Sequence, residues 1–373
     1  MNRFSRRDLM KAGAMALAAP AVLRAHDALA SSGTVSVFAR ADIFSTNSVL
    51  ADFTNATGIT VNLTTYRSDH EALTTLRAAG GKGSDVVFPT LNAGPAFFAQ
   101  RLLQPVNEAR FKTQSVEPAL LARSAELGGT DRGTRYIVPF DWRTEGLTWD
   151  STVFPKTSGD VSYGDLWLSG RNGQTAVRAL TVFAGVARYL DSTGALPSNG
   201  GRDLFTSEAD SRRVFDGCLA FLLAHKAAIG AFWTDAASAT AAFATGGCTI
   251  GQTPDVIGMP LKRTADPKWR YGLPKEGGLG WMVGFAIPSG AANTAQTYEL
   301  LDFLYRPTIA GVLANTTGHN SCARGAGDYL SDFFASDFAA AYPAGTLDAL
   351  FWLPATPNFY RKLRNEYAAK LTG

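Results

Sequence analysis

The chain has 373 residues, of which 46% are hydrophobic and 18% are charged, and its formal net charge is +3 at pH 7. This is the composition of a globular protein long enough to form two lobes, and it excludes a low-complexity or fibrous chain. The first 30 residues carry five basic and two acidic residues, which leaves 30 of each in residues 31–373. That neutral remainder gives no reason to expect nucleic acid or an anionic membrane surface as a partner.

Residues 1–30 have the pattern of a twin-arginine export signal. The pair Arg6 and Arg7 precedes an alanine- and leucine-rich segment, which ends in an A-x-A motif at Ala28–Ala30. This order of elements is typical of a signal peptide that is removed after export. We therefore expect cleavage after Ala30 and a mature chain that works in the periplasm.

The first elements of the mature chain alternate between strand and helix patterns. Short β-branched and aromatic runs predict strands over Thr34–Ala39, Ile59–Tyr66 and Ser84–Pro89. Helical spacing and a closing glycine predict helices over Ser45–Gly58 and Asp69–Gly80. Alternating strands and helices indicate an α/β fold with a mostly parallel sheet.

The segment Arg135–Asp150 is strand-like but contains Pro139, so it fits either an extended crossing between lobes or an edge strand. The later predicted elements are a helix within Asp203–Ala228, a small-residue helix over Asp235–Gly247, strands at Cys248–Thr253 and after Trp281, a helix broken or restarted at Pro307, and a last helix over Asn358–Leu371.

No motif of a known catalytic or cofactor site occurs in the chain: there is no G-x-S-x-G elbow, P-loop or G-x-G-x-x-G. The three histidines after the leader are scattered, and they give no metal-ligand spacing. The three cysteines, Cys218, Cys248 and Cys322, are widely spaced, so a disulfide in the oxidising periplasm stays open. We expect no cofactor and no metal site.

Aromatic and polar residues collect where predicted strands give way to loops. They are Phe44, Tyr66, Thr90, Asn92, Trp142 and Trp281. In an open α/β sheet, ligands bind beyond the carboxyl ends of the strands, and aromatic walls with a few polar groups are typical of small-molecule sites. Core packing is the competing interpretation for each aromatic, and it is favoured for Phe44 and Tyr66.

The motifs "PKEGG", Trp281, "AIP" and "FLYRP", in the order that they occur here, resemble the periplasmic polyamine-binding proteins of the spermidine/putrescine type. The resemblance covers most of the mature chain. It implies a two-lobe, type II binding-protein fold with crossing strands near Val138–Trp142 and Trp281–Phe285, a ligand cleft between the lobes, hinge closure, and an ABC permease of the inner membrane as partner.

On that basis we expect one lobe to comprise residues 31–139, completed by 283–322, and the other to comprise 140–282, completed by 323–373. The resemblance also implies that Trp281 stacks on the ligand. The expected ligand-binding residues are Trp281, Trp142, Arg143, Asp42, Phe44, Thr90, Asn92, Arg178, Gln252 and Asp255.

The chain departs from the polyamine pattern at several charged positions. Val283 stands where that family has an aspartate, Arg143 where it has a glycine, and Arg178 in the segment that holds an acidic pair. Burying a dication without paired carboxylates is costly, whereas arginines favour a carboxylate or phosphonate held by two donors. The sequence therefore predicts a specificity shifted towards an anionic or amino-acid-like ligand.

Three functions stay open at this point. We favour a monomeric periplasmic solute-binding protein that delivers a small molecule to an ABC importer. An exported enzyme that uses the same cleft is the alternative, since twin-arginine export carries folded proteins. A ferric-ion binder would need clustered tyrosines and histidines, and the chain has no adjacent tyrosines.

Overall fold

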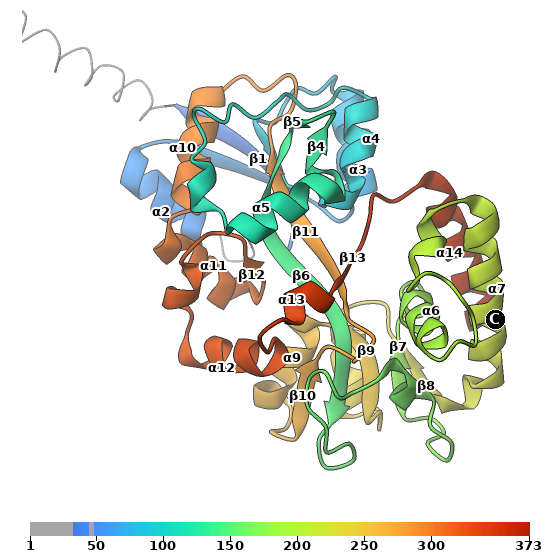
Figure 1. The fold of residues 1–373 in the computed structure, drawn as a ribbon. Coiled ribbons are helices and arrows are strands. Elements are labelled where there is room, and N and C mark those ends of the chain that lie inside the picture. Colours follow the sequence, from blue (N-terminus) through green and yellow to red (C-terminus); the bar gives the residue numbers. More distant parts are fainter. Residues whose placement is uncertain (1–32, 45–47) are drawn as a thin grey trace, which may run out of the picture.

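The computed structural model describes residues 33–44 and 48–373 (Figure 1). The predicted export signal lies outside the described residues. Most predicted elements are present close to their expected bounds. The helices are α2 (Ser48–Thr57), α3 (Asp69–Ala78), α4 (Gly94–Ala99), α5 (Pro118–Ser124), α6 (Val182–Ser192), α7 (Glu208–Ala224), α8 (Ala236–Ala244), α9 (Asp255–Thr264), α10 (Thr294–Leu304), α11 (Pro307–Thr317), α12 (Asp332–Ala341), α13 (Thr346–Ala349) and α14 (Asn358–Thr372).

The strands are β1 (Thr34–Arg40), β2 (Thr60–Tyr66), β3 (Val86–Val87), β4 (Thr130–Asp131), β5 (Thr134–Arg135), β6 (Ile137–Asp150), β7 (Thr175–Val177), β8 (Ile229–Phe232), β9 (Ile250–Pro254), β10 (Trp269–Gly272), β11 (Leu279–Ala286), β12 (Asn320–Ser321) and β13 (Phe351–Trp352). The main sheet has the order β2-β1-β3-β11-β6-β9-β7-β8, with β10 and β12 also paired to β6, and β13 paired to β11.

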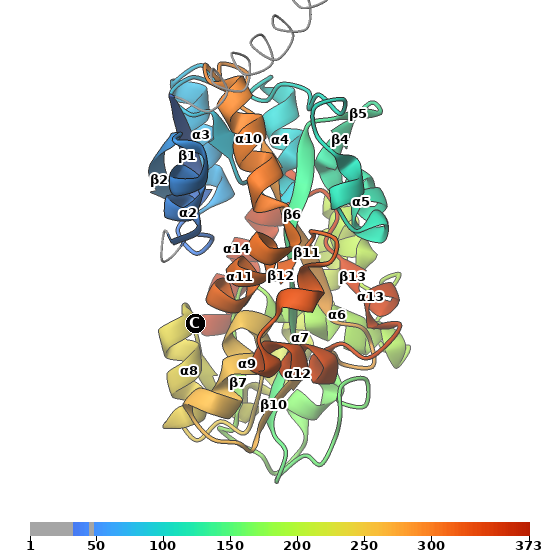
Figure 2. The ribbon, with the colours of Figure 1, turned by 90° about the vertical axis from the view of Figure 1, so that its left-hand side faces the viewer.

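Each end of this sheet is parallel, as the alternation of strands and helices predicts. In the first lobe β1 pairs in parallel with β2 and β3, and in the second lobe β7 pairs in parallel with β8 and β9. The two lobes lie above and below one another in Figure 1, and in Figure 2 β1 and β2 lie with α2 and α3 at one side of the upper lobe. This is the expected two-lobe α/β fold.

Two antiparallel strands, β6 and β11, run from one lobe to the other (Figure 1). All 14 residues of β6 are buried, because β11 and β12 flank its first half and β9 and β10 flank its second half. The strand is therefore a crossing strand and not an edge strand. Pro139 does not interrupt it, since it lies opposite Gly284 at an irregularity in the register, where a missing N–H is tolerated.

The C-terminal segment makes a third connection. Its strand β13 pairs with β11, and it ends in α14, which packs against α7 of the second lobe. Tyr367 of α14 stacks on Phe215 of α7 with ring centroids 5.0 Å apart. Because β6 and β11 belong to both lobes, the exact lobe boundaries stay a prediction.

All three cysteines, Cys218, Cys248 and Cys322, are buried and unpaired in the structure. Burial raises the pKa of the Cys248 thiol to about 11, so this thiol is a weak nucleophile. Within residues 33–44 and 48–373, no helix has the length and apolar character that a membrane span requires.

Candidate functional site

A cavity of about 380 Å³ lies where the parallel strands of both lobes end. Asp42 follows β1, Asp69 follows β2, Thr90 follows β3 and Arg178 follows β7, and each of these residues lines the cavity. The crossing strands add Arg143, Glu145 and Trp281, and the C-terminal segment adds Thr356, Tyr360 and Arg364. The position matches the ligand-binding crevice of open α/β sheets.

Six of the ten expected ligand-binding residues line this cavity: Trp281, Arg143, Asp42, Thr90, Asn92 and Arg178. Trp281 is partly exposed and lies opposite Arg143 in the register of β11 and β6. The amide of Asn92 donates to the Thr356 hydroxyl at 2.8 Å, which joins the first lobe to the C-terminal segment. The Thr90 hydroxyl donates to the Asp69 carboxylate at 2.8 Å.

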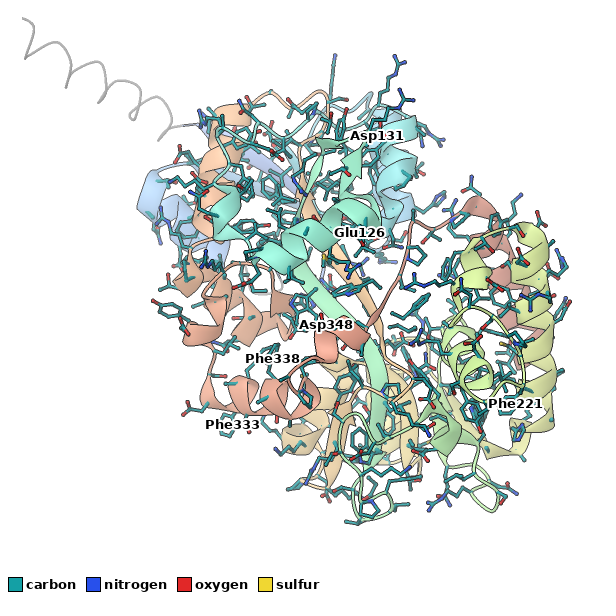
Figure 3. All side chains as sticks on the ribbon, viewed as in Figure 1. Glu126, Asp131, Phe221, Phe333, Phe338 and Asp348 are labelled. Carbon is teal, nitrogen blue, oxygen red and sulfur yellow. The ribbon has the colours of Figure 1, made fainter. Side chains whose placement is uncertain are left out.

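The other four expected residues are buried and do not line the cavity. Phe44 is 5% exposed and packs edge-on against Phe88, with ring centroids 5.4 Å apart. Trp142 is 2% exposed, and its ring contacts those of Tyr342, Trp352 and Phe338. Figure 3 labels Phe338 on α12. Adjacent residues of a strand point to opposite faces, so Arg143 and Trp142 cannot both face one cavity.

Gln252 and Asp255 lie behind the cavity wall, where both are fully buried. The amide of Gln252 donates to the Glu145 carboxylate at 2.6 Å. Asp255 accepts hydrogen bonds from the Thr144 backbone N–H at 3.1 Å and from the Tyr342 hydroxyl at 2.8 Å. Burial outweighs these bonds and raises the pKa of Asp255 to about 6. Both residues therefore support the strands that carry the site.

Arg143 is already paired inside the protein. Its guanidinium donates to Asp141 through Nε at 3.0 Å and through Nη2 at 3.1 Å, and Nη1 donates to Asp42 at 2.5 Å. Burial alone would raise the pKa of Asp42, but Arg143, Arg40 and His319 outweigh it and hold that pKa well below its usual range. An incoming anion would have to compete with two internal carboxylates for Arg143.

His319, which directly precedes β12, lies beside the two carboxylates that Arg143 binds. Its Nδ1 lies 3.5 Å from Asp141 and its Nε2 lies 3.9 Å from Asp42. Burial and the nearby Arg143 guanidinium lower the pKa of His319 to about 4, against the opposing effect of the two carboxylates. The ring is therefore neutral at pH 7.

Glu145 is one of three acidic residues on the cavity wall, with Asp42 and Asp69, and it is 3% exposed. Burial raises the pKa of Glu145, and the amide of Gln252 and the charge of Arg178 offset this only in part. In the described part of the chain Glu145 has no cation within ion-pair distance. Asp69 likewise accepts only from Thr90 there.

Four charged wall residues are absent from the expected site: Arg40, Asp69, Glu145 and Arg364. Asp69 lies three residues beyond the end of β2, so the rule that selected Thr90 could have found it. Glu145 is two residues from Arg143 on the same strand and thus on the same face. Arg364 had a weaker signal, because only its spacing of four from Tyr360 places it on the buried side of α14.

Val283, which stands at the expected aspartate position, is fully buried. It pairs with Asp141 of β6 and forms a bridge to Thr90 on its other side. An ionised aspartate there would add a third carboxylate to the pair already held by Arg143. The valine removes that charge from the strand, so the cavity lacks the amine partner that the polyamine pattern would place there.

Fold and cavity together define a two-lobe solute-binding protein, and comparison with known proteins agrees. The family model described as bacterial extracellular solute-binding protein matches residues 48–342. The chain therefore belongs to this family.

Individual relatives are more distant. A spermidine/putrescine-binding periplasmic protein of Salmonella typhimurium is 24% identical over 356 residues, which cover 94% of each chain. The structure of a spermidine/putrescine ABC transporter substrate-binding protein from Streptococcus pneumoniae has a TM-score of 0.73 at 19% identity, covering 91% of this chain and 98% of that one. A structure described as a GABA receptor has a TM-score of 0.67 at 14% identity, covering 91% of this chain and 96% of that one. The two structures share the fold of this chain.

Proposed function

We propose that this protein binds a small organic solute in the cavity between its lobes and delivers it to an ABC importer of the inner membrane. The observation that carries the proposal is the cavity of about 380 Å³, which residues from both lobes line around a partly exposed Trp281. A wall of polar residues with the aromatic side chains of Trp281, Phe205 and Tyr360 suits a ligand of metabolite size. The named relatives are binding proteins of this kind.

The place of action is part of the proposal. The pattern in residues 1–30 supports export by the twin-arginine route, and the relative from Salmonella is a periplasmic protein. We propose that the mature chain begins after Ala30, works in the periplasm as a monomer, and meets the permease in its liganded form. The residues proposed to meet the solute are Trp281, Thr90, Asn92, Arg178 and Asp69.

The test uses Trp281. If this side chain forms the wall against which the solute lies, Trp281→Ala should weaken binding by roughly 1–3 kcal/mol through lost aromatic contact. The native protein, isolated from the periplasm, is first examined by native mass spectrometry to identify the bound solute. Calorimetry then compares the affinity of the wild type and the variant for that solute.

A matched control is Trp269→Phe, because Trp269 is buried in the second lobe away from the cavity and packs on Phe243. This variant should keep its affinity. Equal affinity of Trp281→Ala and wild type, or a native protein that never carries a solute, would refute the proposed site. Conversion of the solute to a product would favour an exported enzyme instead.

A further inference from the structure

Two arginines on the second-lobe side of the cavity have no acidic partner. Arg178 and Arg364 both line the cavity, and in residues 33–44 and 48–373 neither guanidinium makes a hydrogen bond or an ion pair within 4.0 Å. The Nε atom of each is nevertheless buried. A buried guanidinium N–H without an acceptor is costly, so these groups are arranged for an acceptor that the protein itself does not provide.

The contrast with Arg143 shows that this is specific to the two positions. Arg143 is neutralised by Asp141 and Asp42, and Arg40 also pairs with Asp42 at 3.4 Å. Glu145 is near enough for the charge of Arg178 to lower the pKa of its carboxyl, but it lies beyond ion-pair distance. The ring of Trp233 packs on Arg178, with its centroid 5.4 Å from the guanidinium carbon. That contact orients the side chain and leaves its donors free.

The start of α6 also borders the cavity. Its N-cap residue, Thr181, lines the cavity together with Ala184 in the first turn, and no side chain caps the helix. The Thr181 hydroxyl is buried without a hydrogen bond of ordinary geometry, although it is near enough to Glu145 to lower the pKa of that carboxyl. The backbone N–H groups of Val182 and Ala184 already donate to the carbonyls of Arg178 and Thr181, so the contribution of this 11-residue helix is its dipole, which favours a negative group at this end.

Resting on the proposed function, we infer that the solute carries a carboxylate, held by Arg178 and Arg364 near the N-terminus of α6. On the first lobe the cavity presents the Asp69 carboxylate, which among the described residues accepts hydrogen bonds from Thr90 alone. A ligand with an ammonium group at one end and a carboxylate at the other would meet both kinds of partner. The inferred class is therefore an amino-acid-like metabolite and not a polyamine.

A matched series of five-carbon probes tests the end groups. The probes are 1,5-diaminopentane, 5-aminopentanoate and glutarate, which differ in whether each end is an amine or an acid. Calorimetry with the full mature chain should give the tightest binding for 5-aminopentanoate, measurable binding for glutarate, and the weakest for the diamine. Diamine binding as tight as that of 5-aminopentanoate, or binding of no member of the series, would overturn the inference.

Variants locate the acid end. Arg178→Gln and Arg364→Gln should each weaken 5-aminopentanoate roughly 10- to 100-fold, the size of a lost charge-assisted hydrogen bond. Arg361→Gln is the matched control, because Arg361 is exposed on the same helix as Arg364 and its guanidinium donates to the side chain of Asn358 at 2.6 Å. Unchanged affinity of both cavity variants would place the carboxylate elsewhere and defeat the inference.

Glu145→Gln separates the two ends of the ligand. If the acid end of 5-aminopentanoate lies beside Arg178, removal of the nearby Glu145 carboxyl should preserve or strengthen its binding. If the amine end lies beside Arg178 instead, the variant should bind 5-aminopentanoate more weakly, and the inference fails. Different results would refute the inference and the proposed function. If native mass spectrometry finds a solute without an acid group, the inference of a carboxylate ligand is wrong and the proposed binding function stands. An empty cavity together with unchanged affinity of the Trp281→Ala variant would refute the binding function itself.

Discussion

His319 and Asp255 are two buried titratable residues near Arg143 whose pKa values shift in opposite senses. For His319 the folded pKa is about 4 against an ordinary 6.5, so the unfolded chain binds the proton first as pH falls. Its contribution to stability is thus present above pH 6.5 and is lost between pH 6.5 and 4. For Asp255 the folded pKa is about 6 against 3.8, so the folded chain binds the proton first and stability is lost as pH rises through 6.

We expect these two effects to offset each other largely between pH 7 and 5. His319→Gln should therefore gain stability relative to the wild type on going from pH 7 to pH 5, by about 2 kcal/mol, and Asp255→Asn should lose about 1 kcal/mol relative to it. Urea unfolding of the three proteins at both pH values measures this. The same pH dependence in all three proteins would show that neither residue carries the shift.

For Arg143, the sequence predicted a position on the cavity wall but did not predict the role of the side chain. Its position on the cavity wall follows from its neighbour Trp142 and from the departure from the polyamine pattern. Its internal pairing does not, because Asp42 is about 100 positions away and reaches Arg143 only through the fold. Among the described arginines that line the cavity, Arg178 and Arg364 make no ion pair, and only Arg178 was expected from the sequence.

At the scale of elements, β6 and β11 depend on close backbone approach at Gly284. A Cβ atom there would lie 2.1 Å from Cγ2 of Ile137 and 2.8 Å from the Val138 carbonyl oxygen. Gly284→Ala should therefore lower the free energy of unfolding by about 1–3 kcal/mol, the usual cost of overpacking. Chemical unfolding measures the loss.

Gly327→Ala is the control for that variant, since a Cβ at Gly327 would meet nothing within 4 Å and the backbone there has no positive φ. It should leave stability nearly unchanged. An equally stable Gly284→Ala would mean that the register irregularity opposite Pro139 can relax, and that the two crossing strands are less rigid than their burial indicates.

The same two strands mark how far sequence reasoning reaches. The elements β1, α2, β2 and α3 could be predicted because their periodicity and end signals are local. The continuity of β6 through Pro139 could not, since it depends on which strands flank it and on where Gly284 lies. In the site, residues just beyond strand ends could be predicted by rule, whereas Arg364 reaches the cavity only because α14 packs against α7.

At the scale of the whole molecule, the inferred ligand would connect the two lobes. Its ammonium group would meet Asp69, which begins α3 in the first lobe, and its carboxylate would meet Arg178, which follows β7 in the second. A ligand can shift the lobes only by binding the closed arrangement better than the open one. A probe that touches both lobes has this differential contact, whereas a probe held by one lobe does not.

This gives a prediction for closure that does not depend on affinity. At saturation, 5-aminopentanoate should lower the radius of gyration in small-angle X-ray scattering, because it binds Asp69 and Arg178 at once. Glutarate should bind and produce less change, since its second acid end is repelled by Asp69. The Asp69→Asn variant should still bind glutarate but should no longer close when 5-aminopentanoate binds. Asp131→Asn, at an exposed position on β4, is the control and should close as the wild type does. Equal compaction by both probes, or full closure of the Asp69→Asn variant, would mean that the carboxylate end alone brings the lobes together.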